Sequence, residues 1–270
     1  MKSLRVISPL QNYNTYKTVQ LLVMKQDYRK NMQLFKSEIK SIVSNYECNK
    51  VSYEHLDNFP INSKQCIYVA CWLHGGNVFE KGLKNLTGYD LEEFNTEDLI
   101  EYIHPDDREL VMNIVQEVIK HAIAVDLSEG PAHLFLTFRL RKKDGTYMKV
   151  LRESSSYELN NEGKMISNFS LLTDISFMDS NDCVEWSFEA NELDIQSFKN
   201  IVYSVYQDYF TNREKEIIAL INDGSTNKEI AEKLYISKHT VATHRKKIFR
   251  KAGVSHVQDL ILFCKKNGIL

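Results

Sequence analysis

The sequence predicts an α+β chain in which a helical N-terminal segment (residues 1–63) precedes an antiparallel sheet with helices (64–178), a connector (179–209) and an all-α four-helix domain (210–270). Three observations predict this division. The spacing of apolar residues changes along the chain from a helical period to alternation and back to a helical period. A length of 270 residues suits two modest domains or one large one. The charge is divided unevenly between them.

The net charge of −2 combines an acidic body with a basic C-terminal end. Residues 211–270 hold 12 Lys and Arg against 6 Asp and Glu, whereas residues 1–210 hold 22 against 30. No Asp or Glu occurs from Leu234 to Gln258, a stretch that contains Lys238, Arg245, Lys246, Lys247, Arg250 and Lys251. A solvated helix face usually mixes both signs. The stretch therefore favours a surface for a polyanion such as nucleic acid.

Composition argues against a membrane protein, a secreted protein and the common classes of enzyme. No apolar run approaches the roughly 18 residues of a membrane span, and the N-terminus lacks the apolar core of a signal peptide, so we expect a cytoplasmic protein. The five cysteines are scattered without a CxxC pair, which indicates reduced thiols. Cys66, Cys71 and His74 are close in sequence, but the odd spacing of the cysteines places them on opposite faces of a strand, and no metal site is predicted. The usual catalytic motifs are absent, so no catalytic residue is expected.

The N-terminal segment is predicted to contain a long helix over residues 16–48. Apolar residues recur there at helical spacing: Phe35, Ile39, Ile42, Val43 and Tyr46. Such a stripe must be covered by something. The sequence leaves two alternatives open, the chain's own sheet domain and a second copy of the chain.

The region after residue 64 is predicted to begin with a strand and continue into helices. The apolar run 66–73 predicts the strand, and residues 74–77 predict a turn. Pro105, Asp106 and Asp107 then predict the start of a long helix, because Pro suits the first helical position and carboxylates favour the positive end of the helix dipole. Its apolar stripe comprises Leu110, Val111, Ile114, Val115, Val118, Ile119 and Ala122.

Three antiparallel strands are predicted after this helix. The first is indicated by alternation, with Leu134, Leu136, Phe138 and Leu140 on one face. A tight turn at 144–145 leads into a strand over 146–157, and a second turn at 160–163 leads into a strand over 165–175.

Four motifs in this order resemble the PAS family. They are LTGY at 86–89 with a helix start at 91–94, IHPDDR at 103–108, FRLRKKDG at 138–145 and LTDI at 172–175. The resemblance implies a five-stranded antiparallel sheet with helices packed on one face. It also implies that this domain senses a signal or mediates dimerisation.

PAS domains hold haem, flavin or small metabolites between sheet and helices, or hold nothing and pair with another protein. The cysteine context of the covalent-flavin photosensors is absent from this sequence, and no cofactor is predicted. A small-molecule ligand and a protein partner both remain open. His104 is predicted to cap a helix rather than bind haem, and the helix dipole explains the carboxylates of Asp106 and Asp107, so no site is assigned here.

Four short helices are predicted after Phe210. Thr211 and Glu214 form a capping box at the start of the first helix, which ends at Gly224. The second helix is expected over 227–234, Ser237 is the expected N-cap of the third, and the fourth is expected over 256–266. Leu262 on this last helix is expected to be available for contact with a partner.

The third of these helices has a polar face opposite its apolar face. On a helical wheel, Ile248 and Ala252 fall within about 20° of Val241, whereas the opposite side carries His239, Thr243, Lys246, Lys247 and Arg250. A recognition helix in the major groove requires this arrangement, because short polar groups approach base edges and long cations reach bases and phosphates. His239 and His244 lie about 140° apart on the wheel, too far to share a metal ion comfortably.

Residues 210–262 resemble the LuxR-type (GerE-like) helix-turn-helix family without a gap. The matching residues are 210–214, Gly224, 227–231, 237–241, His244, Ile248 and Lys251. The resemblance implies base-facing positions for Ala242, Thr243 and Lys246, to which the wheel adds His239. It implies contacts near phosphates for Lys228, Ser237, Lys238, Thr240, His244 and Lys247, to which the wheel adds Arg250.

These observations predict a sequence-specific transcription regulator that binds double-stranded DNA, acts as a homodimer, and is controlled by a signal or partner at the PAS-like domain. The alternative is an adaptor that uses the PAS-like domain for interaction or dimerisation and binds DNA only weakly and without specificity. Neither alternative is an enzyme or bound to a membrane. The connector contains apolar residues that a free tether does not need, and we expect it to dock on a domain surface: Val184, Trp186, Phe188, Leu193, Ile195 and Phe198.

Overall fold

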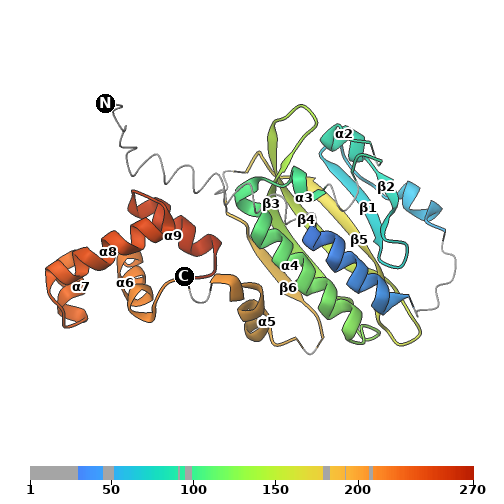
Figure 1. Ribbon diagram of the computed structural model, residues 1–270. Coiled ribbons are helices and arrows are strands. Elements are labelled where there is room, and N and C mark those ends of the chain that lie inside the picture. The colour runs from blue at the N-terminus through green and yellow to red at the C-terminus, as the bar shows by residue number, and fades with distance from the viewer. Residues whose placement is uncertain are drawn as a thin grey trace, which may run out of the picture.

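The computed structural model describes residues 30–44, 52–90, 92–94, 99–178, 183–191, 193–206 and 209–270. Figure 1 shows two bodies, a curved sheet with helices against it and a separate group of short helices formed by the C-terminal part of the chain. The segment containing α5 (Ile195–Val202) lies between them. Within the described ranges, no helix is both long and apolar enough to span a bilayer.

The sheet has six antiparallel strands in the order β2-β1-β5-β4-β3-β6. The strands are β1 (Gln65–Cys71), β2 (Gly76–Lys81), β3 (His133–Arg141), β4 (Tyr147–Leu159), β5 (Met165–Asp174) and β6 (Trp186–Glu189). The predicted central strands are confirmed. The local pattern does not indicate β2, because its six residues are all half-buried and show no alternation.

The expectation of five strands is wrong by one, because the connector supplies β6. Residues 186–189 pair with residues 133–136 of β3. Just before β6, Thr137 and Glu185 exchange hydrogen bonds, since the Thr137 amide donates to the Glu185 carbonyl at 2.8 Å and the Glu185 amide donates to Thr137 Oγ1 at 3.0 Å. Without β6, β3 would be an edge strand with unpaired backbone groups, which sheets usually protect.

One face of the sheet carries the main core, and the other is covered by a smaller cluster. The helices on the main side are α2 (Leu83–Thr87), α3 (Leu99–Tyr102) and α4 (Pro105–Ala124). The predicted alternation in β3 is confirmed, because Leu134, Leu136, Phe138 and Leu140 are all buried in this core. On the other face, the 3-10 helix η1 (Glu54–Asn58) places Leu56 against Ile67 and Val69 of β1.

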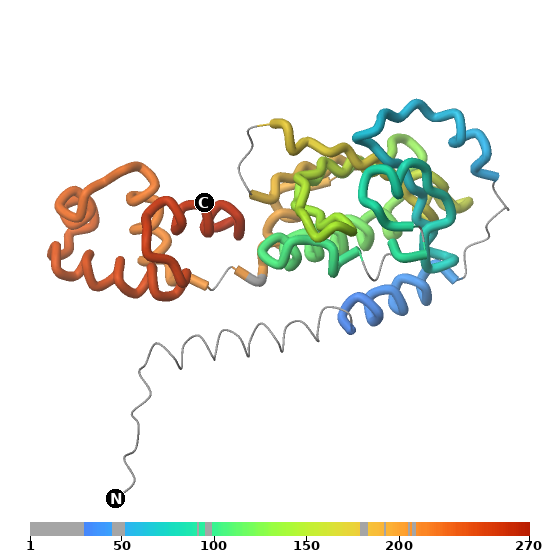
Figure 2. Tube along the Cα trace, turned by 90° about the horizontal axis from the view of Figure 1, so that it is seen from above, coloured from blue at the N-terminus to red at the C-terminus, as the bar shows by residue number. Residues whose placement is uncertain are grey.

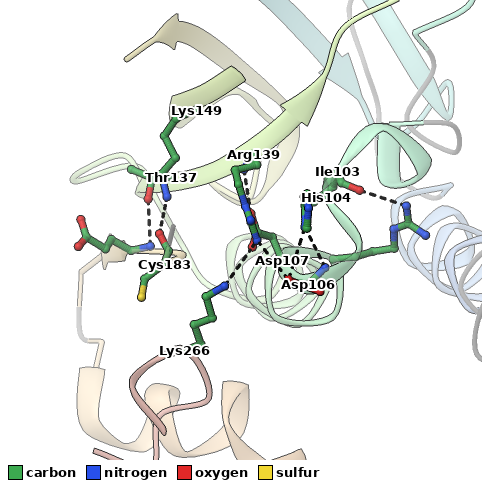
Figure 3. Close-up of polar contacts among 11 residues, drawn as sticks. Ile103, His104, Asp106, Asp107, Thr137, Arg139, Lys149, Cys183 and Lys266 are labelled. Carbon is green, nitrogen blue, oxygen red and sulfur yellow. Dashed lines mark hydrogen bonds and ion pairs between the residues drawn. The ribbon is translucent and has the colours of Figure 1, made fainter. Parts of the chain in front are cut away.

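The first turn of α4 confirms the predicted cap and adds a buried ion pair. His104 Nδ1 accepts a hydrogen bond from the Asp106 amide at 3.2 Å. Asp107 is fully buried and accepts hydrogen bonds from the backbone amide, Nε and Nη2 of Arg139, at 2.9, 3.0 and 2.6 Å (Figure 3). Asp107 therefore ties α4 to β3, a role beyond the helix-dipole effect expected from the sequence.

The helix over residues 30–43 packs on the main core of its own chain. Phe35, Ile39 and Val43 are buried, and the Phe35 ring packs edge-on against Trp72 with 6.4 Å between the ring centroids. Ile42, the other stripe residue described, is exposed. The sequence left two alternatives open for covering this apolar stripe, and the sheet domain of the same chain covers most of it. The rest of the predicted helix, residues 16–29 and 45–48, lies outside the described residues.

The connector is docked, as predicted. After β6, α5 packs along α4, and the 3-10 helix η2 (Ser204–Tyr206) contacts α5. Phe188 and Phe198 are buried in the main core with their ring centroids 5.0 Å apart, whereas Ile195 is exposed. Trp186 Nε1 donates a hydrogen bond to the Tyr203 hydroxyl at 2.9 Å. The connector is thus a structural part of the sheet domain.

Candidate nucleic-acid interface

Residues 209–270 form four helices around a core of their own. The helices are α6 (Asn212–Asn222), α7 (Asn227–Lys233), α8 (Lys238–Ala252) and α9 (Val257–Lys266). The side chains at the centre of this core are Ile217, Ile218, Ile230, Val241, Ile248, Leu260 and Cys264. All four helices lie close to their predicted positions, and this core is distinct from the core of the sheet domain.

Two capping boxes fix the starts of α6 and α7. The predicted box is confirmed, because the Thr211 amide donates to Glu214 Oε2 at 2.9 Å and the Glu214 amide donates to Thr211 Oγ1 at 3.3 Å. Thr226 and Glu229 form a second box, in which the Thr226 amide donates to Glu229 Oε2 at 2.7 Å. This second box was not predicted, although the same Thr-x-x-Glu spacing marks both helix starts.

Glu214 also anchors the far end of α8. Lys251 Nζ lies 2.6 Å from Glu214 Oε2, and the glutamate side chain is only 5 % exposed. Burial alone would raise the pKa of the Glu214 carboxyl, but the hydrogen bonds from Lys251 and Thr211 outweigh it and leave the pKa below its ordinary value. Lys251, counted in the basic stretch of the sequence, therefore holds α8 against α6.

A tight turn joins α7 to α8. Tyr235 adopts a left-handed conformation with φ of 54°, and its side chain is exposed. Ser237 is the N-cap of α8 as predicted, because its Oγ accepts a hydrogen bond from the Thr240 amide at 3.0 Å. The first turn of α8 is thus fixed by its N-cap.

The predicted base-facing residues lie together on the exposed face of α8. Ala242, Thr243, Lys246 and His239 are all exposed, whereas Val241 and Ile248 on the opposite face are fully buried. Thr243 Oγ1 donates back to the His239 carbonyl at 3.1 Å, which leaves the hydroxyl oxygen able to accept another hydrogen bond. The structure therefore brings the four residues to one surface.

The residues predicted to lie near phosphates surround this face. Lys228, Ser237, Lys238, Lys247 and Arg250 are exposed, and Thr240 and His244 are half-buried. Within the described part of the chain, the buried Nδ1 atom of His244 has no hydrogen-bond partner. Ser237 has a structural role in the cap as well, since its hydroxyl also lies 2.9 Å from Thr240 Oγ1.

The charge on this face is not balanced by carboxylates. Among the described residues, Lys238, Lys246 and Lys247 have no carboxylate oxygen within 4.0 Å. The pair of Lys228 with Glu232 is exposed and long, at 4.0 Å. Concentrated positive charge with polar groups on a protruding helix can neutralise phosphates and reach base edges. No such surface is needed to hold the four helices together.

The last turn of α9 and the residues after it contact the sheet domain and the connector. Lys266 Nζ lies 4.0 Å from the buried carboxylate of Asp107 (Figure 3). Gly268 packs against the ring of Tyr203 so closely that a Cβ there would lie 2.4 Å from it. Figure 2 shows this C-terminal end turned toward the sheet domain. The sequence pattern does not indicate this contact, because it joins residues far apart in the chain.

Comparisons with known proteins identify both domains. Residues 208–264 match the family model described as bacterial regulatory proteins, luxR family, and residues 78–168 match the PAS fold. The uncharacterized response regulatory protein YgeK of Escherichia coli is 49% identical over 59 residues, covering 22% of this chain and 40% of that protein. The transcriptional regulatory protein MctR of Rhizobium johnstonii is 43% identical over 63 residues, covering 23% of this chain and 29% of that protein.

The chain thus spans less than half the length of these curated relatives. A solved structure of the Vibrio cholerae VqmA dimer in the absence of target DNA covers 81% of this chain and 89% of its own, with 15% identity and a TM-score of 0.29. The two family models show that the chain combines a PAS fold with a C-terminal domain of the luxR family of bacterial regulatory proteins.

Proposed function

We propose that this protein is a transcription regulator that binds double-stranded DNA in a sequence-specific manner through α8. The observation that carries the proposal is the exposed face of α8, where polar and basic side chains lie together and nearby carboxylates are lacking among the described residues. The match to the luxR family over residues 208–264 supports it. The proposed function is DNA binding alone, without a catalytic step.

The proposed roles follow the position of each side chain on α8 and α7. Thr243, Lys246, His239 and Ala242 face the bases in this proposal, because they are exposed in the N-terminal part of α8, where a recognition helix contacts base edges. A flanking set contacts or is positioned near phosphates: Lys228, Ser237, Lys238, Thr240, His244, Lys247 and Arg250. Phosphate contacts set the orientation on the duplex, and contacts to base edges provide the sequence preference.

We further propose that the protein acts in the cytoplasm as a homodimer under the control of its PAS domain. One recognition helix reads only a few base pairs, and two helices related by a dyad double the contact surface. Leu262 on α9 is exposed and available to such a dimer. Control is supported by the docked connector and by the contact of Lys266 with Asp107, through which the PAS domain touches the four-helix domain.

The test is selection of DNA from a random duplex library with the full chain, followed by affinity measurements at several salt concentrations. We expect an enriched motif with dyad symmetry and an affinity that falls steeply with salt, because counterions are released from the phosphates. Lys142→Ala serves as a matched control, since Lys142 is a lysine on the sheet domain far from α8 in the sequence. An adaptor without specific binding would enrich no motif.

A further inference from the structure

A cleft of about 690 Å³ lies where the connector meets the four-helix domain. One wall is formed by β6 and α5, from which Trp186 and Lys199 line the cleft. The other wall is formed by Lys215 of α6, Lys265 of α9 and the C-terminal end at 268–270, which Figure 2 shows turned toward the sheet domain. The volume falls within the roughly 300–1,000 Å³ of small-molecule sites. No described residue of α4 lines this cleft, so it is separate from the space between the sheet and its helices.

The side chains of the cleft carry an excess of positive charge. Lys199, Lys215 and Lys265 come from three different helices. Among the described residues that line the cleft, Glu185 is the only one with a carboxylate side chain. Lys199 and Lys265 are exposed, and Lys199 Nζ lies 5.9 Å from the centroid of the Trp186 ring. A concave surface with this excess of one sign attracts an anion.

The kind of cation favours a phosphate over a carboxylate. The planar fork of arginine is the best match for a carboxylate, and none of the described residues that line the cleft is an arginine. Lysine binds phosphate as a point charge. Three lysines and one glutamate leave an excess of two positive charges. A phosphate monoester carries about −1.5 to −2 at neutral pH, which matches this excess.

The rest of the lining suits an aromatic ring with polar edges. Trp186 and Tyr203 are half-buried, and the hydrogen bond from Trp186 Nε1 to the Tyr203 hydroxyl at 2.9 Å holds the two rings together. Gln196 and Asn200 of α5 add side-chain amides, which can both donate and accept hydrogen bonds. Ile269 adds an apolar contact from the other wall. A nucleobase has a flat apolar face and polar edges and can use both kinds of surface.

We propose that this cleft binds a nucleoside monophosphate, with its phosphate among the three lysines and its base beside Trp186 and the amides of α5. The ligand contacts the connector and the C-terminal end of the chain at once. It therefore stabilises the arrangement in which these two parts are docked, because a ligand favours the state that it binds more tightly. A role of this ligand in regulating DNA binding rests on the proposed function, whereas its binding to the cleft does not.

The experiment is calorimetric titration of the full chain with AMP, GMP, CMP and UMP, with the four corresponding nucleosides, and with inorganic phosphate. We expect the tightest of the four nucleotides to bind at least about 10-fold more tightly than its nucleoside and than inorganic phosphate, because only the nucleotide uses both the lysines and the ring surface. If the nucleoside or inorganic phosphate binds as tightly as that nucleotide, or if none of the four nucleotides binds at about 1 mM, the proposal is wrong.

Two lysine variants and a control locate the site. Lys199→Met and Lys265→Met each remove one charge, from opposite walls, and each should weaken the nucleotide about 5- to 20-fold without changing the affinity for the nucleoside. Both lysines are exposed, so the thermal midpoints should stay close to that of the unmodified chain. Lys233→Met is the control, because Lys233 is an exposed lysine of the four-helix domain that does not line the cleft. An equal loss in Lys233→Met would indicate unspecific attraction, and a loss in only one of the two cleft variants would contradict a site shared by both walls.

A variant that fills the cleft tests the position of the base. Gln196→Trp keeps the three lysines and adds bulk on the exposed side of α5, so it should weaken the nucleotide and the nucleoside alike. Unchanged affinity for both in this variant would place the base elsewhere and overturn the proposal. The proposed function fails by a different result, the absence of specific DNA binding.

Discussion

Lys266 Nζ, in the last turn of α9, lies 4.0 Å from Asp107 Oδ1 in the first turn of α4 (Figure 3). The same carboxylate binds Arg139 of β3, and the Lys266 side chain is only 17% exposed. The position of α9 is therefore linked to the part of the PAS domain where helix and sheet are joined. A change in the placement of α4 on β3 would alter the surroundings of Lys266, and we expect the two domains to be coupled through this contact.

Lys246 and Lys247 should differ in what they contribute to DNA binding. Lys246→Ala should cost about 1–3 kcal/mol and relax the preference at one base position, because Lys246 is exposed on the polar side of α8 and is proposed to contact a base edge. Lys247→Ala should weaken all sequences alike and reduce the salt dependence by about one phosphate contact. Competition binding with a set of single-base variants of the selected motif measures both effects. Equal, sequence-independent losses for the two variants would contradict this division of roles.

Much of the proposed DNA-binding surface is predictable from sequence, because it depends on one helix. A period of 3.6 residues places Val241 and Ile248 opposite Thr243 and Lys246 without knowledge of the rest of the fold. Local capping patterns likewise predict where α6 and α8 begin. The same pattern places Lys251 in the basic stretch but does not predict its ion pair, because its partner Glu214 lies on another helix.

The features that the sequence does not predict are contacts between distant segments. β6 pairs with β3 across about 50 residues of chain, and Arg152 meets its serine partner on β5 across a hairpin. Neither contact leaves a local period, since pairing depends on which edge of the sheet is free and which face is covered. Lys266 and Asp107 are separated still further in sequence.

Glu214 should stabilise the four-helix domain most at neutral pH and lose its effect in acid. Its pKa is below the ordinary value of 4.5 in the folded state, so its contribution is fully present above the unfolded pKa and is lost as the pH falls through the folded pKa. Glu214→Gln should lower the free energy of unfolding at pH 7 by about 1–3 kcal/mol, because it leaves Lys251 without its charge partner. Urea unfolding at pH 7 and in acid measures this.

The control for this variant is Glu216→Gln on the same helix. Glu216 pairs with Arg213 at 2.7 Å, but its side chain is 53% exposed, so the change should cost less than about 1 kcal/mol. A Glu214→Gln variant as stable as this control at pH 7 would show that the pair with Lys251 is unimportant.

His121 should make the docking of the connector sensitive to acid. Its ring packs edge-on against Phe188 and Phe198 of the connector, and burial holds the His121 pKa below its ordinary value of 6.5. A lowered pKa means that the stability contributed by the neutral ring is present above the unfolded pKa and is lost as the pH falls through the folded pKa. Trp186 lies in β6 beside Phe198, and its fluorescence should therefore change reversibly below about pH 6. His121→Leu should remove that transition; a variant that keeps it places the titrating group elsewhere.

Gly268 should be the position where a minimal change separates the two domains. It has φ of 62°, and a Cβ there would lie 2.4 Å from the Tyr203 ring, whereas Gly224 has φ of 77° and nothing within 4 Å of the equivalent point. Alanine at either position carries a similar backbone penalty of about 1 kcal/mol, but only Gly268→Ala forces the end of the chain off the connector.

Because binding linkage is reciprocal, operator DNA should alter hydrogen exchange in α4 and α5 of the unmodified chain and of Gly224→Ala. In Gly268→Ala that response should disappear, while the selected DNA motif stays the same, since α8 is untouched. If Gly268→Ala retains the full response, the signal passes by a path other than the contact of the C-terminal end with Tyr203 and Asp107.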